Sequence, residues 1–459
     1  MSGRADLLLR GGTAVLRDEV LVLDIGIKDG KIVQLGSGLA GEADEIIDAA
    51  GLVVMAGAID VHVHLNEPGL GEWEGFASGS AALAAGGCTA YFDMPLNGIP
   101  PTVTVPALRQ KLAAAEGRSY VDYALWGGLV PGRLEELEAL NEAGVIGFKA
   151  FMSAPGDPGE EAFREADDLT LWEGMKRIAR MNRVLALHAE SEPLVAGLTK
   201  LKRAQRAAGA DDYSASRPVL AELEAVNRAL FYAGKTGCPV HFVHISSEAA
   251  VLAIAEAKRR GLDVTVETCP HYLTLTDEDL KRIGPAAKCA PPLRSREEQE
   301  RLWRTLASGH IDMIASDHSP CPAAMKETDD YFAAWGGISG AQSTLELMLD
   351  EGHLKRGIPL TRISHLLSYA PARRFGLHPR KGEIRIGADA DLVLVDLDQP
   401  YELRERDLLY RHKISPYIGR HFRCKVAATL SRGRLVYDGK RGMDAKALGH
   451  GRRLGGAVR

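Results

Sequence analysis

The sequence predicts an α/β protein: a (β/α)8 (TIM) barrel over residues 56–379, with a small β-sandwich domain built from both termini, residues 1–55 and 380–445. Three observations predict this architecture. Between Ile59 and Pro320, eight apolar, β-branched runs alternate with helix-length segments; β patterns without intervening helices occupy both ends; and eight such units in about 260 residues match a barrel. An open doubly wound sheet is the alternative, but the sequence has no Gly-rich dinucleotide loop after the first run and no P-loop.

The first 55 residues read as short strands separated by turns. Asp29-Gly30, which lies between two alternating apolar runs, predicts a hairpin. The same texture returns in residues 382–398 and 425–440, so we expect the two ends of the chain to pair in one domain. Residues 446–459, rich in Gly and Arg, are expected to form a solvated C-terminal tail.

The middle of the chain supplies the eight expected barrel strands. In order they are AIDVHVHL, CTAYFDMPL, YVDYALWGGLV, VIGFKAFM, RVLALHAE, CPVHFVHIS, DVTVETCPHYLTL and HIDMIASDHSP. Helix-length segments separate them, for example VPALRQKLAAAEG, LTLWEGMKRIARMN, EAAVLAIAEAKRRG and SREEQERLWRTLASG.

Composition excludes several classes of function. The 459 residues contain 56 Lys and Arg against 61 Asp and Glu, a net charge of −5, which argues against nucleic-acid or membrane partners. No apolar run approaches the ~20 residues of a membrane span, and the opening residues do not read as a signal peptide, so a cytoplasmic location is expected. The six cysteines form no CxxC pair and are expected to be reduced and buried.

Six polar side chains fall late in the barrel runs, where a barrel places its active site: His62, His64, Lys149, His188, His244 and Asp317. Taken singly, each has an ordinary explanation as a hydrogen-bonded or snorkelling residue. Together, four imidazoles, an ammonium and a carboxylate in one barrel mouth would be costly to bury without compensation. Divalent cations would remove that cost, so the sequence predicts a metal site.

The lysine points to two metal ions. Beside two dications, and buried, Lys149 would become a neutral amine, which can capture CO2 to form a carbamate (N6-carboxylysine) that bridges the ions. We therefore expect one metal held by His62, His64 and Asp317, and a second held by His188 and His244. Zinc is the expected metal, although these ligands also accept iron, cobalt or manganese.

With these residues in place, the sequence resembles the cyclic amidohydrolases of the amidohydrolase superfamily, from the N-terminal β segment to about residue 440. The paired histidines of HVH, the lysine of KAFM, single histidines ending two later strands and an aspartate ending the last are the specific signature of the family's binuclear centre. The resemblance implies a barrel with a β-sandwich, hydrolysis of a cyclic amide in a small-molecule substrate, and a homo-oligomer, commonly a tetramer.

Within this family the sequence is most similar to the allantoinase branch, in the segments HLNEPG, EWEGF, MPLNGIPPT, KCAPPLR, SDHSPC and WGGISG. Dihydroorotases carry an arginine where this chain has Asn66, and an amide cannot replace that carboxylate clamp. Dihydropyrimidinases and hydantoinases carry a tyrosine where this chain has Ala154. They remain the alternative enzymes, and a catalytically silent assembly protein of the same fold is the alternative of another class.

Roles follow for individual residues. Asp317 is the expected catalytic residue, a general base and then a general acid, because no other carboxylate ends a run in the same position. His318 is a candidate to orient Asp317, and structural roles are expected for His241, His271 and His310. Asn97 could equally be a turn residue. The candidates for substrate binding are Asn97, Ser319, Ser153 and the backbone around Cys289 and Gly337.

Overall fold

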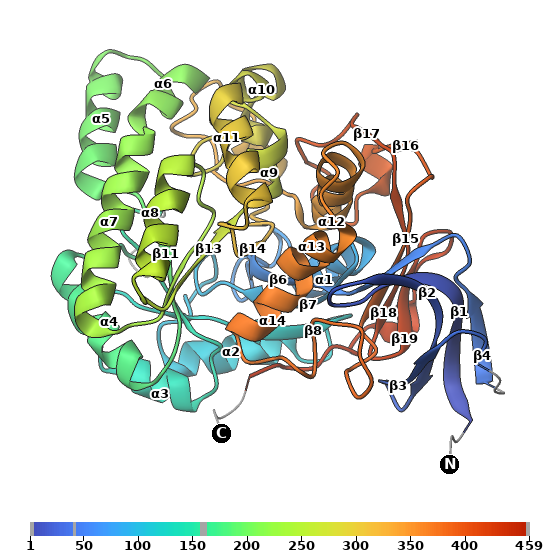
Figure 1. Cartoon of the computed structure of the whole chain (residues 1–459). Helices are drawn as coiled ribbons and strands as arrows, with labels where there is room; N and C mark the ends of the chain where they lie inside the picture. Colours follow the sequence, from blue (N-terminus) through green and yellow to red (C-terminus); the bar gives the residue numbers. More distant parts are fainter. Residues whose placement is uncertain (1–3, 40–42, 157–162, 456–459) are drawn as a thin grey trace.

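The computed structural model describes residues 4–39, 43–156 and 163–455, and it forms a closed barrel with a β-rich domain beside it (Figure 1). The barrel is formed by parallel strands, each of which carries a run predicted from the sequence. They are β6 (Ala58–Val63), β7 (Cys88–Asp93), β8 (Asp122–Leu125) with β9 (Gly127–Gly128), β10 (Phe148–Phe151), β11 (Leu185–His188), β12 (Val240–Phe242), β13 (Val264–Thr268) and β14 (Met313–Ile314).

The barrel closes between its first and last strands. β6, β7 and β8 form one hydrogen-bonded group and β9 to β14 the other. A parallel bridge between Val63 and His318 joins the two groups, and the amide of His64 donates to the carbonyl of His318 at 2.8 Å. The predicted barrel is therefore confirmed, and the open doubly wound alternative is excluded.

Helices cover the outside of the barrel and bury its apolar strand faces. The four predicted helical segments are present and begin at well-formed caps; for example, the Thr104 hydroxyl accepts from the amide of Ala107 at the start of α2. The helices are α1 (Phe76–Ala85), α2 (Val105–Ala115), α3 (Glu136–Glu142), α4 (Asp168–Arg180), α5 (Glu192–Ala204), α6 (Ala210–Ser216), α7 (Val219–Thr236), α8 (Glu248–Arg259), α9 (Pro270–Thr274), α10 (Asp277–Ile283), α11 (Arg296–Ala307), α12 (Thr344–Leu347), α13 (Leu360–Ser364) and α14 (Ala370–Arg374), with π-helical turns at Met348–Leu354 and His365–Tyr369.

Both ends of the chain build the β-rich domain, as predicted. Its single sheet has nine strands, and β5 from the N-terminal half pairs with β15 from the C-terminal half. These two ends, blue and red, lie side by side on the right of Figure 1. The strands are β1 (Ala5–Val15), β2 (Val20–Lys28), β3 (Lys31–Gly36), β4 (Ala43–Asp48), β5 (Val53–Ala56), β15 (Leu392–Asp396), β18 (Lys425–Ser431), β19 (Arg434–Asp438) and β20 (Gly442–Met443); a separate pair is β16 (Tyr401–Glu402) with β17 (His421–Phe422).

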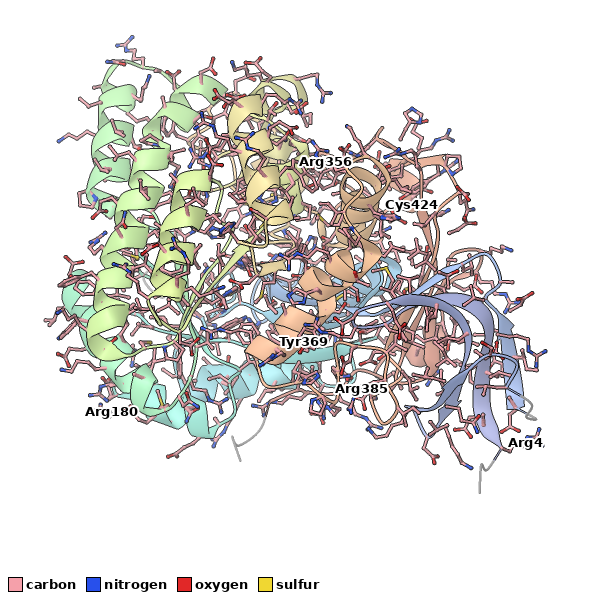
Figure 2. All side chains as sticks on the ribbon, in the orientation of Figure 1. Arg4, Arg180, Arg356, Tyr369, Arg385 and Cys424 are labelled. Carbon is pink, nitrogen blue, oxygen red and sulfur yellow. The ribbon has the colours of Figure 1, made fainter. Side chains whose placement is uncertain are left out.

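The Asp29-Gly30 hairpin is present between β2 and β3, where Lys28 pairs with Lys31. One contact from the β domain to the barrel starts from the turn after β1. The Arg17 guanidinium carbon lies 3.4 Å from the ring centroid of Tyr369, a residue labelled in Figure 2, and its Nη1 lies 2.8 Å from His365 Nδ1. Arg17 therefore fixes the β domain against the last helices of the barrel.

Two expectations from the sequence are wrong. The seventh run was expected to stay extended to Leu275, but Pro270, which suits the first turn of a helix, begins α9 instead. The described part of the C-terminal tail is not a free, fully solvated extension: although Leu448 is 44% exposed, Leu454 is only 3% exposed and its amide donates to the carbonyl of Tyr123. Among the described residues, no helix is long and apolar enough to cross a membrane.

Candidate metal centre and active site

The polar side chains singled out in the sequence lie on, or shortly after, the carboxyl ends of five barrel strands. These strands supply His62 and His64 (β6), Lys149 (β10), His188 (β11), His244 (β12) and Asp317 (β14). His244, with φ 41°, and Asp317, with φ 48°, adopt the left-handed backbone that residues other than glycine rarely use. Such conformations cluster at functional sites, where the surrounding structure fixes the side chain.

The six side chains converge in two groups. Asp317 Oδ1 lies 3.1 Å from His62 Nε2 and 3.3 Å from His64 Nε2. On the other side, His188 Nδ1 lies 3.0 Å from His244 Nε2. The two groups adjoin, because the rings of His62 and His244 have centroids 5.4 Å apart, and His62, His244 and Asp317 present ligand atoms within 4.8 Å of one another.

Lys149 is fully buried beside both groups, and its Nζ has no hydrogen-bond partner among the described residues. Burial lowers the pKa of Lys149 from 10.5 to about 7, although the charges of Asp317 and Glu267 raise it. The neutral amine is therefore accessible near neutral pH, which is the form that reacts with CO2.

Two buried carboxylates that the prediction from sequence missed, Glu267 and Asp60, form hydrogen bonds with residues of this cluster. Glu267, in β13, has one oxygen 2.6 Å from His62 Nδ1 and the other 2.8 Å from His241 Nε2, and it accepts the amide of His244 at 3.2 Å. Asp60 accepts the amides of His62 and Ser316 at 3.2 and 3.1 Å. Burial raises the pKa of Glu267 to about 8 and that of Asp60 to about 7. The missed signal was an acidic residue inside an otherwise apolar strand.

A third carboxylate fixes His188. Its Nε2 lies 2.7 Å from Glu190 Oε2, and the Arg217 guanidinium donates to the same oxygen. The charge of Arg217 and the bond from His188 hold the pKa of Glu190 at about 2 despite its burial. Glu190 is therefore an anion that leaves His188 Nδ1 directed toward His244.

A cavity of about 700 Å³ opens onto the cluster. Of the residues predicted to bind metal or substrate, those that line it are His62, His64, His188, His244, Asp317, Asn97 and Ser319. Asn97 has the backbone of a turn residue, with φ 60°, and its Nδ2 lies 3.2 Å from His64 Nδ1. The rest of the wall includes Trp73, Ala154, Tyr213, Arg217, Lys288, Trp335 and Gly336.

Three predicted substrate contacts do not line the cavity in the described structure: Ser153, Cys289 and Gly337. Ser153 is buried, and the carbonyl of Cys289 is taken by the Tyr213 hydroxyl at 2.9 Å. Gly337 packs so closely on Ser319 that a Cβ there would collide with it. Their chain neighbours Ala154, Lys288, Ala290 and Gly336 face the cavity in their place.

His318 does not have the role considered for it. Its ring packs on Tyr410 with centroids 4.8 Å apart, and its Nε2 lies 3.5 Å from Glu74. The backbone turns at Asp317, where φ is 48°, and the side chain that follows points away from the site. His241, by contrast, supports the site through Glu267.

Comparison with known proteins places this geometry in a family. A family model described as "Amidohydrolase family" matches residues 53–436, which is most of the chain. The chain belongs to the amidohydrolase family. Two curated relatives named allantoinase, from Rubrobacter xylanophilus and Solibacter usitatus, are 54% and 51% identical to it; each match covers 95% of this chain, and 95% and 94% of theirs.

The solved structures give the same placement. The L-hydantoinase (dihydropyrimidinase) from Arthrobacter aurescens superimposes with a TM-score of 0.95 at 36% identity, over 98% of this chain and 100% of that one. The chain is a cyclic amidohydrolase with the barrel and β domain of these proteins.

The amidohydrolase family implies a divalent metal centre, and the residues present fit one. Lys149 Nζ and His244 Nδ1 are buried without a hydrogen-bond partner among the described residues. Burial, followed by the charges of Lys149 and neighbouring histidines, lowers the pKa values of His62 and His244 well below 6.5, so both rings are neutral, the form that binds metal. Neutral imidazoles around a carboxylate are a donor set for a divalent transition metal.

Proposed function

We propose that this amidohydrolase is an allantoinase, which hydrolyses a ring amide of allantoin to give allantoate. The observation that carries the proposal is its 54% identity to a curated allantoinase over 95% of both chains, a match that takes in the barrel and the β domain together. Allantoin is a hydantoin ring with a ureido arm, and it is neutral. Asn66 stands where dihydroorotases carry an arginine that binds a carboxylate, so a neutral substrate agrees with this position. Its Nδ2 already donates to the carbonyl of Pro320.

His62, His64 and Asp317 would hold one metal ion, His188 and His244 a second, and carboxylated Lys149 both. Bound divalent ions would supply a nucleophilic water near neutral pH and would polarise the amide carbonyl. Zinc is the proposed metal, with iron, cobalt or manganese as substitutes.

The chain's own groups account for the proton transfers. Water adds to the ring carbonyl carbon, the ring C–N bond breaks, and the product carries a carboxylate and a free amide nitrogen. Asp317 would take the proton from the attacking water and give it to the departing nitrogen. Oδ1 of Asp317 faces His62 and His64, which leaves the second oxygen for this transfer. Asn97 and Ser319, both on the cavity wall, would position the ring.

The proposal is tested with purified, metal-loaded protein and four cyclic substrates: allantoin, hydantoin, dihydrouracil and dihydroorotate. We expect the highest kcat/KM with allantoin and none measurable with dihydroorotate. A hydantoinase is the second candidate, favoured by the TM-score of 0.95 to the L-hydantoinase, and turnover of hydantoin but not of allantoin would establish it in place of the first. Less than one equivalent of metal per chain after supplementation would support the silent assembly protein.

Three further parts of the proposal concern the whole chain. Its location is cytoplasmic, and it assembles as a homotetramer, which light scattering would measure. Its domains are a β domain of residues 1–55 and 380–445, a catalytic barrel of residues 56–379 and a tail of residues 446–459. Limited proteolysis, which cuts first at domain boundaries, would test these limits.

A further inference from the structure

Lys288 is a buried lysine in the cavity wall that the proposed mechanism does not use. Burial lowers its pKa from 10.5 to about 7, and a further hydrogen-bond acceptor at its Nζ would stabilise the ammonium form. Lys288 is 4% exposed, and among the described residues no carboxylate lies within ion-pair distance of it. Its Nζ donates to the carbonyl of Ala334 at 2.5 Å, which occupies one of the three ammonium donors. A buried ammonium with unused donors is costly unless another acceptor reaches it.

Open space lies beside this ammonium. Gly336 has no side chain, and a Cβ placed there would lie 3.9 Å from Lys288 Nζ and 4.0 Å from the Tyr213 hydroxyl. The Tyr213 hydroxyl donates to the carbonyl of Cys289 at 2.9 Å, so its oxygen can still accept a hydrogen bond. Lys288, Tyr213 and Gly336 therefore form a subsite with donors and an acceptor, which we call the 288 subsite.

The 288 subsite connects to the reaction centre along one wall of the cavity. Lys288 Nζ lies 4.6 Å from the Tyr213 ring centroid, and the Arg217 guanidinium lies 5.8 Å from the same centroid. Arg217 donates to Glu190, which lies 2.7 Å from the ring of His188. His188, Arg217, Tyr213 and Lys288 all line the same cavity, so a molecule bound at the histidine cluster can extend a substituent within that cavity toward Lys288.

We infer that Lys288 is a specificity-determining residue whose ammonium donates to the carbonyl oxygen of the ureido arm of allantoin. The arm also carries N–H groups, which the Tyr213 hydroxyl oxygen can accept, and Gly336 leaves the room that the arm needs. The inference rests on the proposed function, because it names the group that separates allantoin from plain hydantoin. No bond is made or broken in this step.

The test compares allantoin with hydantoin, which has the ring but not the arm. In metal-loaded wild type and Lys288→Met, KM and kcat are measured for allantoin, and hydantoin is measured as a competitive ligand. A charge-assisted hydrogen bond predicts a roughly tenfold to hundredfold loss in kcat/KM for allantoin, and a much smaller change in the inhibition constant of hydantoin. Equal losses for both molecules would overturn the inference.

Lys326 provides a matched control, because it is a lysine that bonds to the residues on either side of Gly336 but does not line the cavity. Its Nζ donates to the carbonyls of Pro285, Trp335 and Gly337 at 2.9, 2.8 and 2.7 Å. Lys326→Met therefore disturbs the loop without removing the cation of the 288 subsite. We expect Lys326→Met to change kcat/KM for allantoin and the inhibition constant of hydantoin by similar factors.

Gly336→Ala tests the same subsite without changing its charge. The added methyl group would fill the gap beside Lys288 and Tyr213, so the ratio of allantoin to hydantoin affinity should fall in this variant too. An unchanged ratio in Gly336→Ala would contradict the inference even if Lys288→Met did not fold. If wild type failed to hydrolyse allantoin, the proposed function would fail first; calorimetric titration of both molecules would still measure the contribution of Lys288.

Discussion

At the scale of single residues, the site contains buried ionisable groups whose protonation states depend on one another. Lys149 is an amine without a partner, and Glu267 is a carboxyl group with three, two imidazole nitrogens and one amide. Both have pKa values moved by burial toward the neutral form. A metal ion reverses this tendency, because cations stabilise carboxylates and carbamates that burial alone would neutralise.

The bridging role of Lys149 leads to a rescue experiment. We expect Lys149→Ala to lower kcat/KM for the cyclic amide substrate by roughly 100-fold or more, because both metal ions lose a shared ligand. Millimolar acetate or propionate should restore part of the activity and of the bound metal, measured by mass spectrometry. Lys111→Ala is a matched control, since Lys111 is equally buried but pairs with Asp93; its defect should not respond to added acid. Full activity without rescue in Lys149→Ala would exclude the carbamate.

Glu267 allows a test of metal binding that does not depend on turnover. Glu267→Gln should weaken metal affinity roughly tenfold to hundredfold, because His62 loses the anion that orients it. Retained metal after dialysis against a graded chelator measures this. Glu222→Gln is the control: Glu222 is also fully buried, but it bonds to Ser246 and Ser247 and to no metal-site histidine. If the two variants lost metal equally, Glu267 would have no specific role.

The sequence predicted which residues gather in the histidine cluster better than it predicted which residues line the cavity wall. A histidine at a strand end is visible in the strand pattern, because the side chain must face the barrel mouth. Which side of a loop faces the cavity depends on its packing, so the prediction chose Cys289 and Gly337 where Lys288 and Gly336 line the wall. Likewise, the backbone turn that sends His318 toward Tyr410 has no signature in the sequence.

At the scale of elements, the barrel strands were predicted well because each is an apolar run bounded by a helix. The position of the tail was not predicted, because the contacts that align it with the barrel are made by backbone groups. The Tyr123 amide donates to the carbonyl of Arg452, and the Leu454 amide donates to the carbonyl of Tyr123, so the tail adds to β8 as a further extended segment. Any residue can make these bonds, and the buried side chains of Ala447 and Leu454 add apolar anchors.

Leu454 should therefore contribute to stability although it lies five residues from the end of the chain. Leu454→Ala should reduce the free energy of unfolding by roughly 2 to 4 kcal/mol, the range for a buried leucine. Leu448→Ala, at a site that is 44% exposed, should change it by less than ~0.5 kcal/mol. Urea denaturation of the two variants measures the difference, and similar values would show that the tail is not a structural part of the barrel.

At the scale of the whole molecule, buried charges join the two domains. Lys381 Nζ lies 2.8 Å from Asp122 of the barrel and 3.1 and 2.5 Å from Asp389 and Asp391 of the β domain. The three carboxylates are close enough to hold a metal ion, but the ammonium already occupies their centre. The charges of these carboxylates raise the pKa of Lys381 despite its burial, so the cluster keeps its cation.

A second contact between the domains should make stability depend on pH. Glu346, in α12, accepts the Tyr401 hydroxyl and, at 2.7 Å, the amide of Val426, close to the labelled Cys424 in Figure 2. Burial raises the pKa of Glu346 from 4.5 to about 7, although the hydrogen bonds from Tyr401 and Val426 lower it. Above the unfolded value, unfolding releases a proton, so the stabilising effect is complete below pH ~4.5 and is lost as pH rises through ~7.

Glu346→Gln removes that proton equilibrium. The decrease in unfolding free energy between pH 5 and pH 8 should then be smaller than in wild type, by an amount on the order of 3 kcal/mol or less. Urea titrations at both pH values measure it. Glu402→Gln, on the exposed neighbouring strand β16, is the control and should keep the wild-type dependence. An identical dependence in Glu346→Gln and wild type would contradict this account.

The pairing of β5 with β15 also bears on how the molecule is made. When the ribosome has completed β5, its partner strand β15 has not yet been translated, because the whole barrel lies between them in the sequence. At cellular translation rates this interval lasts tens of seconds, during which a nascent chain exposes an open apolar strand edge. Chaperones that protect this edge during synthesis should therefore improve recombinant yield.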